Sequence, residues 1–219
     1  ELNIIIDDNI AQTDKQGLLN CFANEFSKKY DSILSKIFYG CTMGMTGCIG
    51  CFNSGRNQFK YTFQCFSFLI FPLLEAKKYC VTSGRLNQMN YYNYILNIED
   101  CFIYNQKIDY FTTPDNMMYC NACGGMQPSL MNNKIYSSPP VLIIILNRGK
   151  ANLDFTEPFI FWENIDISNY IEFKEENNNY FLAGVITHLG ESGAGGHFIA
   201  FCRMSPTSQW YCYNDSLVT

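Results

Sequence analysis

Apolar residues recur at spacings of three and four through the first part of the chain, and this period predicts an amphipathic helix over residues 10–38. Asp14 is placed to cap its first turn, since an aspartate side chain can accept from free backbone N–H groups there. The positions that carry the period are Leu18, Leu19, Phe22, Phe26, Tyr30, Ile33, Leu34 and Ile37.

Shorter patterns follow the helix. Residues 59–74 alternate and then become continuously apolar, and the runs FSFLIFPLL at 66–74 and VLIIIL at 141–146 read as buried strands, too short to span a bilayer. Residues 90–105 favour a short helix, and residues 76–118 otherwise stay unassigned. Pro139 and Pro140 divide a strand pair over 134–148, residues 158–171 favour a strand and a turn, and a β-meander begins at Tyr180. The sum predicts an α+β fold with a mostly antiparallel sheet.

Composition narrows the class of protein. The chain has 219 residues, of which 47% are hydrophobic and 16% charged, and its net charge is −5. This length supports one domain with a core. The acidity disfavours nucleic acid as a partner, and the short apolar runs disfavour a membrane. No signal peptide is visible, and because the sequence opens on Glu1, we expect the natural N-terminus to lie outside it.

Eleven cysteines are present, and an odd count disfavours a secreted disulfide scaffold. Two C-x-x-C pairs offer the four thiolates of a tetrahedral zinc site, with glycines at 47, 50, 124 and 125 to allow tight knuckles. The alternative is a set of unrelated buried thiols. Cys41 is a substitute ligand. A zinc site favours a reducing, intracellular compartment, cytoplasm or nucleus. The predicted ligands are Cys48, Cys51, Cys120 and Cys123, and the predicted core thiols are Cys65, Cys80, Cys101, Cys202 and Cys212.

Both histidines fall in the last forty residues. His197 follows the loop GESGAGG and opens the apolar strand HFIAFCR, and the next strand, WYCYND, ends on Asn214 and Asp215. A histidine at the start of one strand that faces an Asn or Asp at the end of its neighbour is the arrangement of a general base and its orienting residue. The alternative is a core histidine before a hairpin.

This stretch resembles the histidine box of the ubiquitin-specific proteases. The matching residues are Tyr180, Leu182, Val185, His188, Gly190, Gly196, His197, Phe198, Trp210, Tyr213, Asn214 and Asp215. The cysteine pairs also stand where this family carries a zinc ribbon, after Phe38-Tyr39-Gly40 and before a segment from Lys134 to Arg148. The resemblance covers about residues 14–219.

The resemblance implies a papain-like cysteine protease fold, with a helical lead-in at 1–40, fingers at 41–140 and a palm at 141–219. On this resemblance we expect the thumb to be largely missing from the sequence. It further implies hydrolysis of isopeptide bonds at the terminal glycine of ubiquitin, with structural zinc and with ubiquitin, ubiquitinated proteins and other subunits of a larger complex as partners. His197, Asn214 and Asp215 are the expected catalytic residues. The loop 190–196 would border the channel for ubiquitin's tail, and the substrate contacts are expected from His188, Gly195, Gly196 and Phe198.

The family's nucleophile box has no intact copy. The nearest string, Gly17 to Asn24, contains Cys21 but lacks the Gly-Asn-Thr of the box, and it also fits a later helix of the family. In mid-helix, Cys21 would gain nothing from the helix dipole. We therefore expect an upstream nucleophile and a domain cropped at both ends. An inactive ubiquitin-binding or scaffold module is the alternative, and a zinc-ribbon structural protein with an incidental histidine is a third hypothesis.

Overall fold

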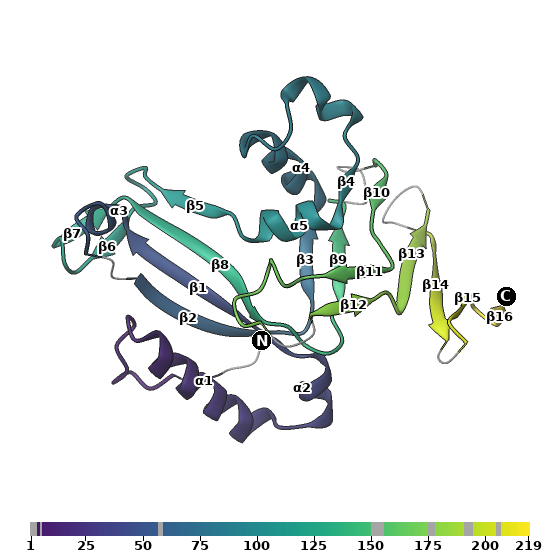
Figure 1. Cartoon of the computed structure of the whole chain (residues 1–219), viewed down its shortest axis with the longest axis horizontal. Coiled ribbons are helices and arrows are strands. Elements are labelled where there is room, and N and C mark those ends of the chain that lie inside the picture. The colour runs from purple at the N-terminus through teal and green to yellow at the C-terminus, as the bar shows by residue number, and fades with distance from the viewer. Residues whose placement is uncertain are drawn as a thin grey trace. The chain divides into compact units, whose positions relative to one another are not determined.

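The computed structural model describes residues 4, 6–56, 59–149, 156–174, 178–190, 195–204 and 207–219 (Figure 1). They belong to two units. The first unit comprises residues 1–69, 105–144 and 170–175, and the second comprises residues 70–104, 145–169 and 176–219. Antiparallel pairs dominate both, which confirms the predicted α+β class. In the described part of the chain no helix is long and apolar enough to cross a membrane.

A four-stranded sheet forms the first unit. β1 pairs antiparallel with β2 on one side and with β8 on the other, and β8 also pairs with β5. Cys41 stands opposite Cys65, and Met43 opposite Phe63. Because side chains alternate along a strand, these four share one face of the sheet. The strands are β2 (Phe59–Phe66), β1 (Gly40–Cys48), β8 (Ser129–Ser137) and β5 (Ile108–Phe111).

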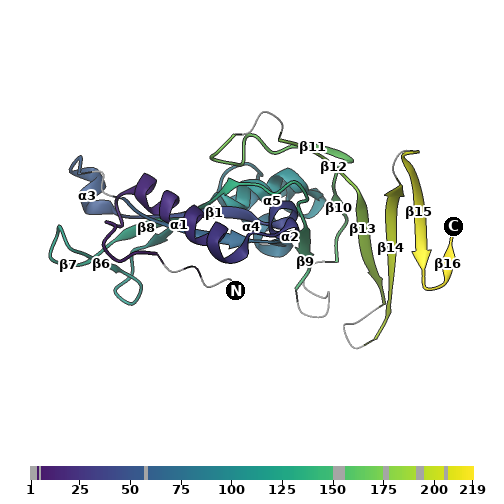
Figure 2. The same ribbon diagram turned by 90° about the horizontal axis from the view of Figure 1, so that it is seen from below.

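Helix α1 (Lys15–Tyr30) covers this face (Figure 2). Leu18 and Phe22 are buried against Cys41, Met43 and Phe63. The predicted cap is confirmed, since the Asp14 side chain accepts from the backbone N–H of Gly17 at 2.9 Å.

The single helix predicted over 10–38 is wrong in its middle. α1 ends at Tyr30, and a second helix, α2 (Ile33–Phe38), begins after Ser32. The Ser32 hydroxyl accepts a hydrogen bond from the backbone N–H of Ser35 at 3.1 Å, and the Ser35 hydroxyl accepts one from the backbone N–H of Ser32 at 2.9 Å. This capping box gives the backbone N–H groups local partners and so favours the start of a new helix at Ser32. The apolar spacing of the sequence continues across this break and therefore does not reveal it.

Short elements close the far end of the sheet. The glycine-rich segment before Cys48 is strand β1, and it leads into α3 (Ile49–Asn53). A hairpin of β6 (Met118–Cys120) and β7 (Gly125–Gln127) precedes β8. The two C-x-x-C pairs therefore lie on a strand-to-helix turn and on a hairpin.

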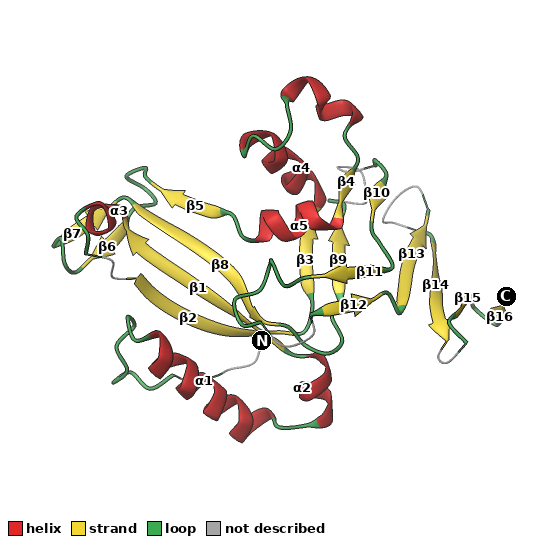
Figure 3. Cartoon of the chain, viewed as in Figure 1, coloured by secondary structure: helices red, strands yellow, loops and turns green. Residues whose placement is uncertain are grey.

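The second unit packs two helices beside a pair of strands, β3 (Leu69–Pro72) and β9 (Ile144–Asn147) (Figure 3). α4 (Leu73–Thr82) follows β3 directly, and α5 (Ile98–Asn105) follows β4 (Leu96–Asn97), which pairs with β10 (Phe159–Ile160). A 3₁₀ helix, η1 (Gln88–Asn93), lies between them. The core of this unit includes Phe71, Leu73, Ala76, Cys80, Leu96, Cys101 and Phe102.

Both apolar runs were predicted as buried strands, and both predictions are partly wrong. The run at 66–74 contains the end of β2, all of β3 and the start of α4. In the run at 141–146, the strand starts only at Ile144, and Val141, Ile143 and Ile145 are exposed. Continuous apolar runs lack a period, so they separate neither strand from helix nor the buried side of a strand from its exposed side.

Two charged side chains are buried in the second unit. Lys77 of α4 is fully buried, where it pairs with Glu157 and lies 4.7 Å over the ring of Tyr91. Asp100 of α5 accepts from the hydroxyl of Tyr94 at 2.6 Å and from the backbone N–H of Asn97 at 3.1 Å. Both bonds reach Oδ2 of Asp100, whereas its buried Oδ1 accepts no hydrogen bond and lies 3.4 Å from the guanidinium of Arg85, so each buried charge faces an opposite charge.

The predicted meander is present, but it begins at Gly184 and not at Tyr180, which lies in β12 (Asn179–Phe181). Its four-stranded sheet has the order β13–β14–β15–β16, and all neighbours are antiparallel (Figure 2). A hairpin-like pair of β11 (Asn164–Asp166) and β12 precedes it. The strands of the meander are β13 (Gly184–Leu189), β14 (His197–Met204), β15 (Gln209–Asn214) and β16 (Leu217–Val218).

Replacing Phe22 by alanine should destabilise the first unit, because its ring is 5% exposed in the α1 core and truncation would leave a cavity. Truncation of a core phenylalanine costs about 3–5 kcal/mol of unfolding free energy. Ile33→Ala is the control: Ile33 is 74% exposed, and its change should stay within about 0.5 kcal/mol. Urea denaturation of both variants measures the difference. Equal losses would contradict the assigned core.

Candidate functional site

The meander sheet positions the two histidines and their partners. His197 is the first residue of β14, where it stands opposite Leu189 of β13. Asn214 is the last residue of β15. Ala200 of β14 stands opposite Tyr213 of β15, so the ladder carries Asn214 alongside Ile199.

Alternation along the strands puts the side chains of His197 and Asn214 on one face, because both share the face of Ile199. His197 Nε2 lies 2.5 Å from Asn214 Oδ1 and 3.8 Å from Asp215 Oδ2. The predicted pairing of a histidine at a strand start with an asparagine at its neighbour's end is thus present as a hydrogen bond.

The bond assigns a role to each ring nitrogen. An amide oxygen only accepts, so Nε2 of His197 carries the hydrogen, and Nδ1 of the neutral ring holds the free lone pair. The His197 side chain is 41% exposed, which leaves it accessible to a reacting group. The arrangement is able to take a proton at Nδ1 while Nε2 stays tethered.

Asp215 lies just beyond the ladder, in the turn between β15 and β16, with φ of 51°. Its side chain is 80% exposed, and its Oδ2 lies 3.8 Å from His197 Nε2. The two side chains form an ion pair only when His197 is protonated. In water such a pair is worth little in stability. Asp215 thus lies beside the His197–Asn214 pair without a hydrogen bond to it.

The residues expected to contact substrate lie differently. His188 stands opposite Phe198, so both share the sheet face opposite to that of His197. Their ring centroids are 4.7 Å apart. Gly196 has φ of +145°, and Gly195 faces open space. Of the loop 190–196, residues 191–194 lie outside the described residues. The sequence reasoning missed the face of His188, although the strand register would have given it, and the substrate contacts stay a prediction.

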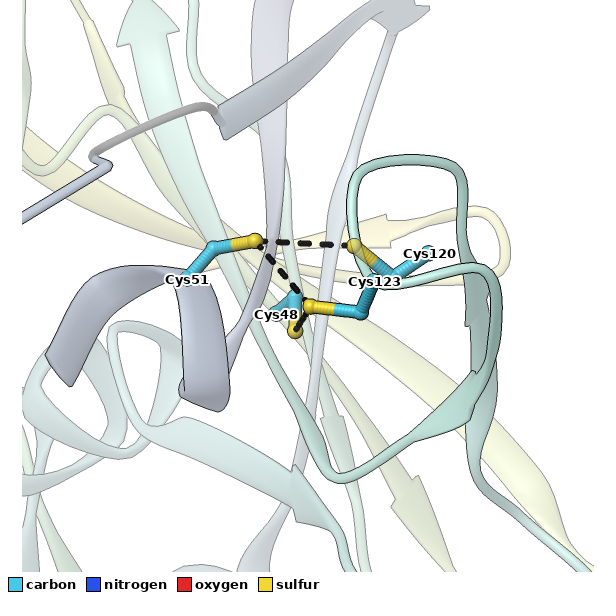
Figure 4. A group of neighbouring side chains, drawn as sticks. All are labelled: Cys48, Cys51, Cys120 and Cys123. Atoms are coloured by element: carbon cyan, nitrogen blue, oxygen red, sulfur yellow. Dashed lines mark hydrogen bonds between the residues drawn. The ribbon is translucent and has the colours of Figure 1, made fainter. Parts of the chain in front are cut away.

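Four cysteines gather at the end of the first unit (Figure 4). Their sulfurs all lie within 4.8 Å of one another. Cys51 Sγ is 3.6 Å from that of Cys120 and 3.5 Å from that of Cys123, and Cys48 Sγ is 3.9 Å from that of Cys123. The structure thus brings together all four predicted ligands, and the group could hold a metal ion.

Local backbone geometry prepares one of these sulfurs. Gly124 takes φ of +70°, which a residue with a Cβ rarely adopts, and its N–H donates to the Cys120 carbonyl at 2.9 Å. Desolvation raises the pKa of the Cys120 thiol, but hydrogen bonds from the backbone N–H of Cys123 and from the neighbouring thiols outweigh this effect and lower the pKa to about 7. Within the same cluster, hydrogen bonds with Cys123 and Cys120 raise the pKa of Cys51 to about 12, so ionisation favours Cys120 over Cys51.

The other cysteines divide into two kinds. Cys41, the substitute ligand, lies at the opposite end of β1 from the cluster and is buried in the α1 core, where desolvation raises its pKa to about 12. Cys21 lies in mid-helix, as expected. Among the predicted core thiols, Cys80 and Cys101 are buried and Cys65 and Cys212 are half-buried, whereas Cys202 is exposed. The prediction for Cys202 is wrong, because its side of the meander sheet is open.

Solved structures of one class share this fold. The SAGA Ubp8/Sgf11/Sus1/Sgf73 DUB module bound to ubiquitin aldehyde matches with a TM-score of 0.64 and 22% identity, over 93% of this chain and 43% of that chain. A structure of the yeast SAGA DUBm matches with a TM-score of 0.66 and 20% identity, over 93% and 44%. The fold is therefore that of a ubiquitin-specific protease domain.

Sequence relatives agree. The profile of the family described as ubiquitin carboxyl-terminal hydrolase matches residues 6–219, so the chain belongs to this family. Ubiquitin carboxyl-terminal hydrolase 8 of Saccharomyces cerevisiae is 26% identical over 88% of this chain and 38% of that protein. Ubiquitin carboxyl-terminal hydrolase 48 of Danio rerio is 31% identical over 54% of this chain and 12% of that protein. The chain thus spans well under half the length of these relatives. Because it belongs to this family, the hypothesis of an unrelated zinc-ribbon protein is wrong.

Thiol reactivity should separate Cys41 from Cys202. With a pKa of about 12, Cys41 holds a thiolate fraction of about one in ten thousand at pH 8, and burial adds a barrier to any reagent. Alkylation of the folded protein at pH 8, mapped by mass spectrometry, should label Cys202 and leave Cys41 unmodified until the protein unfolds. Comparable labelling rates at both sites would contradict the described burial.

Proposed function

We propose that this chain supplies the general base and its orienting residue to a deubiquitinating cysteine protease. The observation that supports this most directly is the 2.5 Å contact between His197 Nε2 and Asn214 Oδ1, in a chain that belongs to the ubiquitin carboxyl-terminal hydrolase family. The substrate is an isopeptide bond between the terminal glycine of ubiquitin and a lysine amine.

The reaction uses the free nitrogen of His197. Nδ1 takes the proton of a cysteine thiol, and the thiolate attacks the carbonyl carbon of ubiquitin's last glycine. When the C–N bond breaks, Nδ1–H passes the proton to the leaving amine, and a thioester remains. Nδ1 then takes a proton from the water that attacks this thioester, which releases the ubiquitin carboxylate, and it returns the proton to the cysteine sulfur. Asn214 holds the ring in position throughout, and Asp215, whose Oδ2 lies 3.8 Å from Nε2, supports this network or stands in for Asn214.

We assign the nucleophile to a cysteine outside this sequence. Cys21 belongs to the string nearest to the family's nucleophile box, but it lies in the middle of α1, away from the helix end whose dipole would favour its thiolate. The incomplete box also keeps a second function open: an inactive domain that binds ubiquitin or serves as a scaffold in a larger complex. The similar Ubp8 structure contains further subunits and bound ubiquitin aldehyde, which supports both ubiquitin and other subunits as partners.

Zinc fits the four-cysteine cluster. Zinc–sulfur bonds of about 2.3 Å in a tetrahedron put the sulfurs about 3.8 Å apart. The recorded separations of 3.5, 3.6 and 3.9 Å lie close to this edge length. Cys48, Cys51, Cys120 and Cys123 would hold the ion, whose role is to tie α3 to the β6–β7 hairpin and not to enter the reaction. Such thiolates persist in a reducing environment, so we place the protein inside the cell.

The full-length protein that carries this chain should form a covalent adduct with ubiquitin whose C-terminus bears a thiol-reactive electrophile. His197→Ala should slow adduct formation by about 100-fold or more, the size of effect that a general base supplies. Ile186→Ala, an exposed position on the same sheet, serves as the control. Mass mapping of the adduct identifies the nucleophile.

The outcomes of this experiment separate the two functions. Loss of the adduct in His197→Ala alone supports the protease. Binding of ubiquitin without any adduct in the unchanged protein would overturn it and favour the inactive module. An adduct that forms equally in both variants would remove His197 from the mechanism.

Elemental analysis of the purified protein should find about one zinc per chain. Cys51→Ser should abolish this content and lower the melting temperature, because loss of one thiolate weakens a tetrahedral site and metal binding is coupled to folding. Cys202→Ser is the matched control, since Cys202 is exposed and outside the cluster. Unchanged zinc content in Cys51→Ser would contradict the assigned ligands.

A further inference from the structure

We propose that His188 is a positioning residue for the reaction, one that sets the placement of His197 from the opposite face of the meander sheet. This inference rests on the proposed function, and it differs from the substrate contact expected for His188 from the sequence. It rests on the contacts of the His188 ring with the two residues that flank His197, namely Gly196 and Phe198.

The first contact is with Phe198, the residue immediately after His197. The two rings lie with centroids 4.7 Å apart at an interplanar angle of 50°. Since His188 and Phe198 are directly opposed across the β13–β14 ladder, the ring contact spans both strands. It restrains β14 at its second residue.

The second contact is with Gly196, the residue immediately before His197. A Cβ built on Gly196 would lie 2.2 Å from Nε2 and 2.4 Å from Cε1 of His188, so the ring lies directly against this backbone. No side chain other than hydrogen fits there. The ring therefore touches the chain on both sides of His197 while the His197 side chain projects to the other face.

This packing matters because the ladder ends here. Among the described residues, the pair of Leu189 and His197 is the last one between β13 and β14. The backbone dihedrals at Gly196 and His197 decide where the His197 ring points, and hence whether Nε2 reaches Asn214. A displacement of about 1 Å at such a group can cost about 100-fold in rate.

The two roles for His188 predict different kinetics. A substrate contact made equally in the ground and transition states changes KM, whereas misplacement of the base lowers kcat and leaves KM almost unchanged. For His188→Ala we expect kcat to fall by about 10- to 100-fold, with KM within about twofold. His188→Phe keeps a ring on Gly196 and Phe198, and it should recover most of the loss. Ile186→Ala, on the same face and strand and 76% exposed, is the control.

A second readout is independent of catalysis. The chain has two histidines, so ring-¹⁵N labelling gives signals that the variants assign. The Nε2–H proton of His197, held by Asn214, should exchange slowly with water in the unchanged protein and in His188→Phe. In His188→Ala its exchange should accelerate by about 10-fold or more, because the hydrogen bond loses its geometry.

If His188→Ala does not fold, Gly196→Ala tests the same contact with His188 retained, because the added methyl group would displace the ring. Gly195→Ala is its matched control in the NMR readout, as a Cβ at Gly195 meets no atom within 4 Å.

The outcomes are separable. Faster exchange in His188→Ala and Gly196→Ala supports the positioning role. A complete lack of catalytic activity, in the unchanged protein as well, would contradict only the proposed function. Unchanged exchange with a raised KM would overturn the positioning role in favour of a substrate contact. Unchanged exchange and unchanged kinetics would remove both roles.

Discussion

The antiparallel register between β14 and β15 governs how His197 and Asn214 meet. Ala200 faces Tyr213, and this single alignment puts His197 and Asn214 on one face at hydrogen-bond distance. A slip by one residue would carry Asn214 to the other face, since side chains alternate along a strand. The short turn at Asp215, with its left-handed backbone, fixes where β15 must end. The site is thus specified by backbone hydrogen bonds more than by the packing of its own side chains.

The four-cysteine cluster imposes a second constraint, on the first unit. Cys48 and Cys123 are 75 positions apart in the sequence, yet their sulfurs lie 3.9 Å apart. The β1–β8 ladder, in which Cys48 stands opposite Ser129, already brings the ends of this segment together. The elements that carry the sulfurs are a five-residue helix and a hairpin of three-residue strands, and a bound ion would tie them to each other. The α1 core, by contrast, is built around the buried rings of Phe22 and Phe63.

Features governed by short-range chemistry could be predicted from the sequence, and features governed by tertiary context could not. The Asp14 cap, the cysteine cluster and the pair of His197 with Asn214 follow from residue type and spacing. The start of α4 inside an apolar run did not, because continuous hydrophobicity carries no period. Ser32 ended a helix whose apolar period continued past it. The exposure of Cys202 and the face of His188 depended on which strands pair and on what covers the sheet.

The glycines at the neck of the loop before His197 have a consequence for how the site tolerates change. A Cβ on Gly190 would lie 2.9 Å from the carbonyl oxygen of Gly195 and 3.0 Å from the Cα of Gly196, so the two ends of the loop meet at the sheet edge. A side chain at position 190 would therefore displace the backbone immediately before His197, and with it the imidazole. The placement of this ring thus depends on a residue that contributes no side chain of its own.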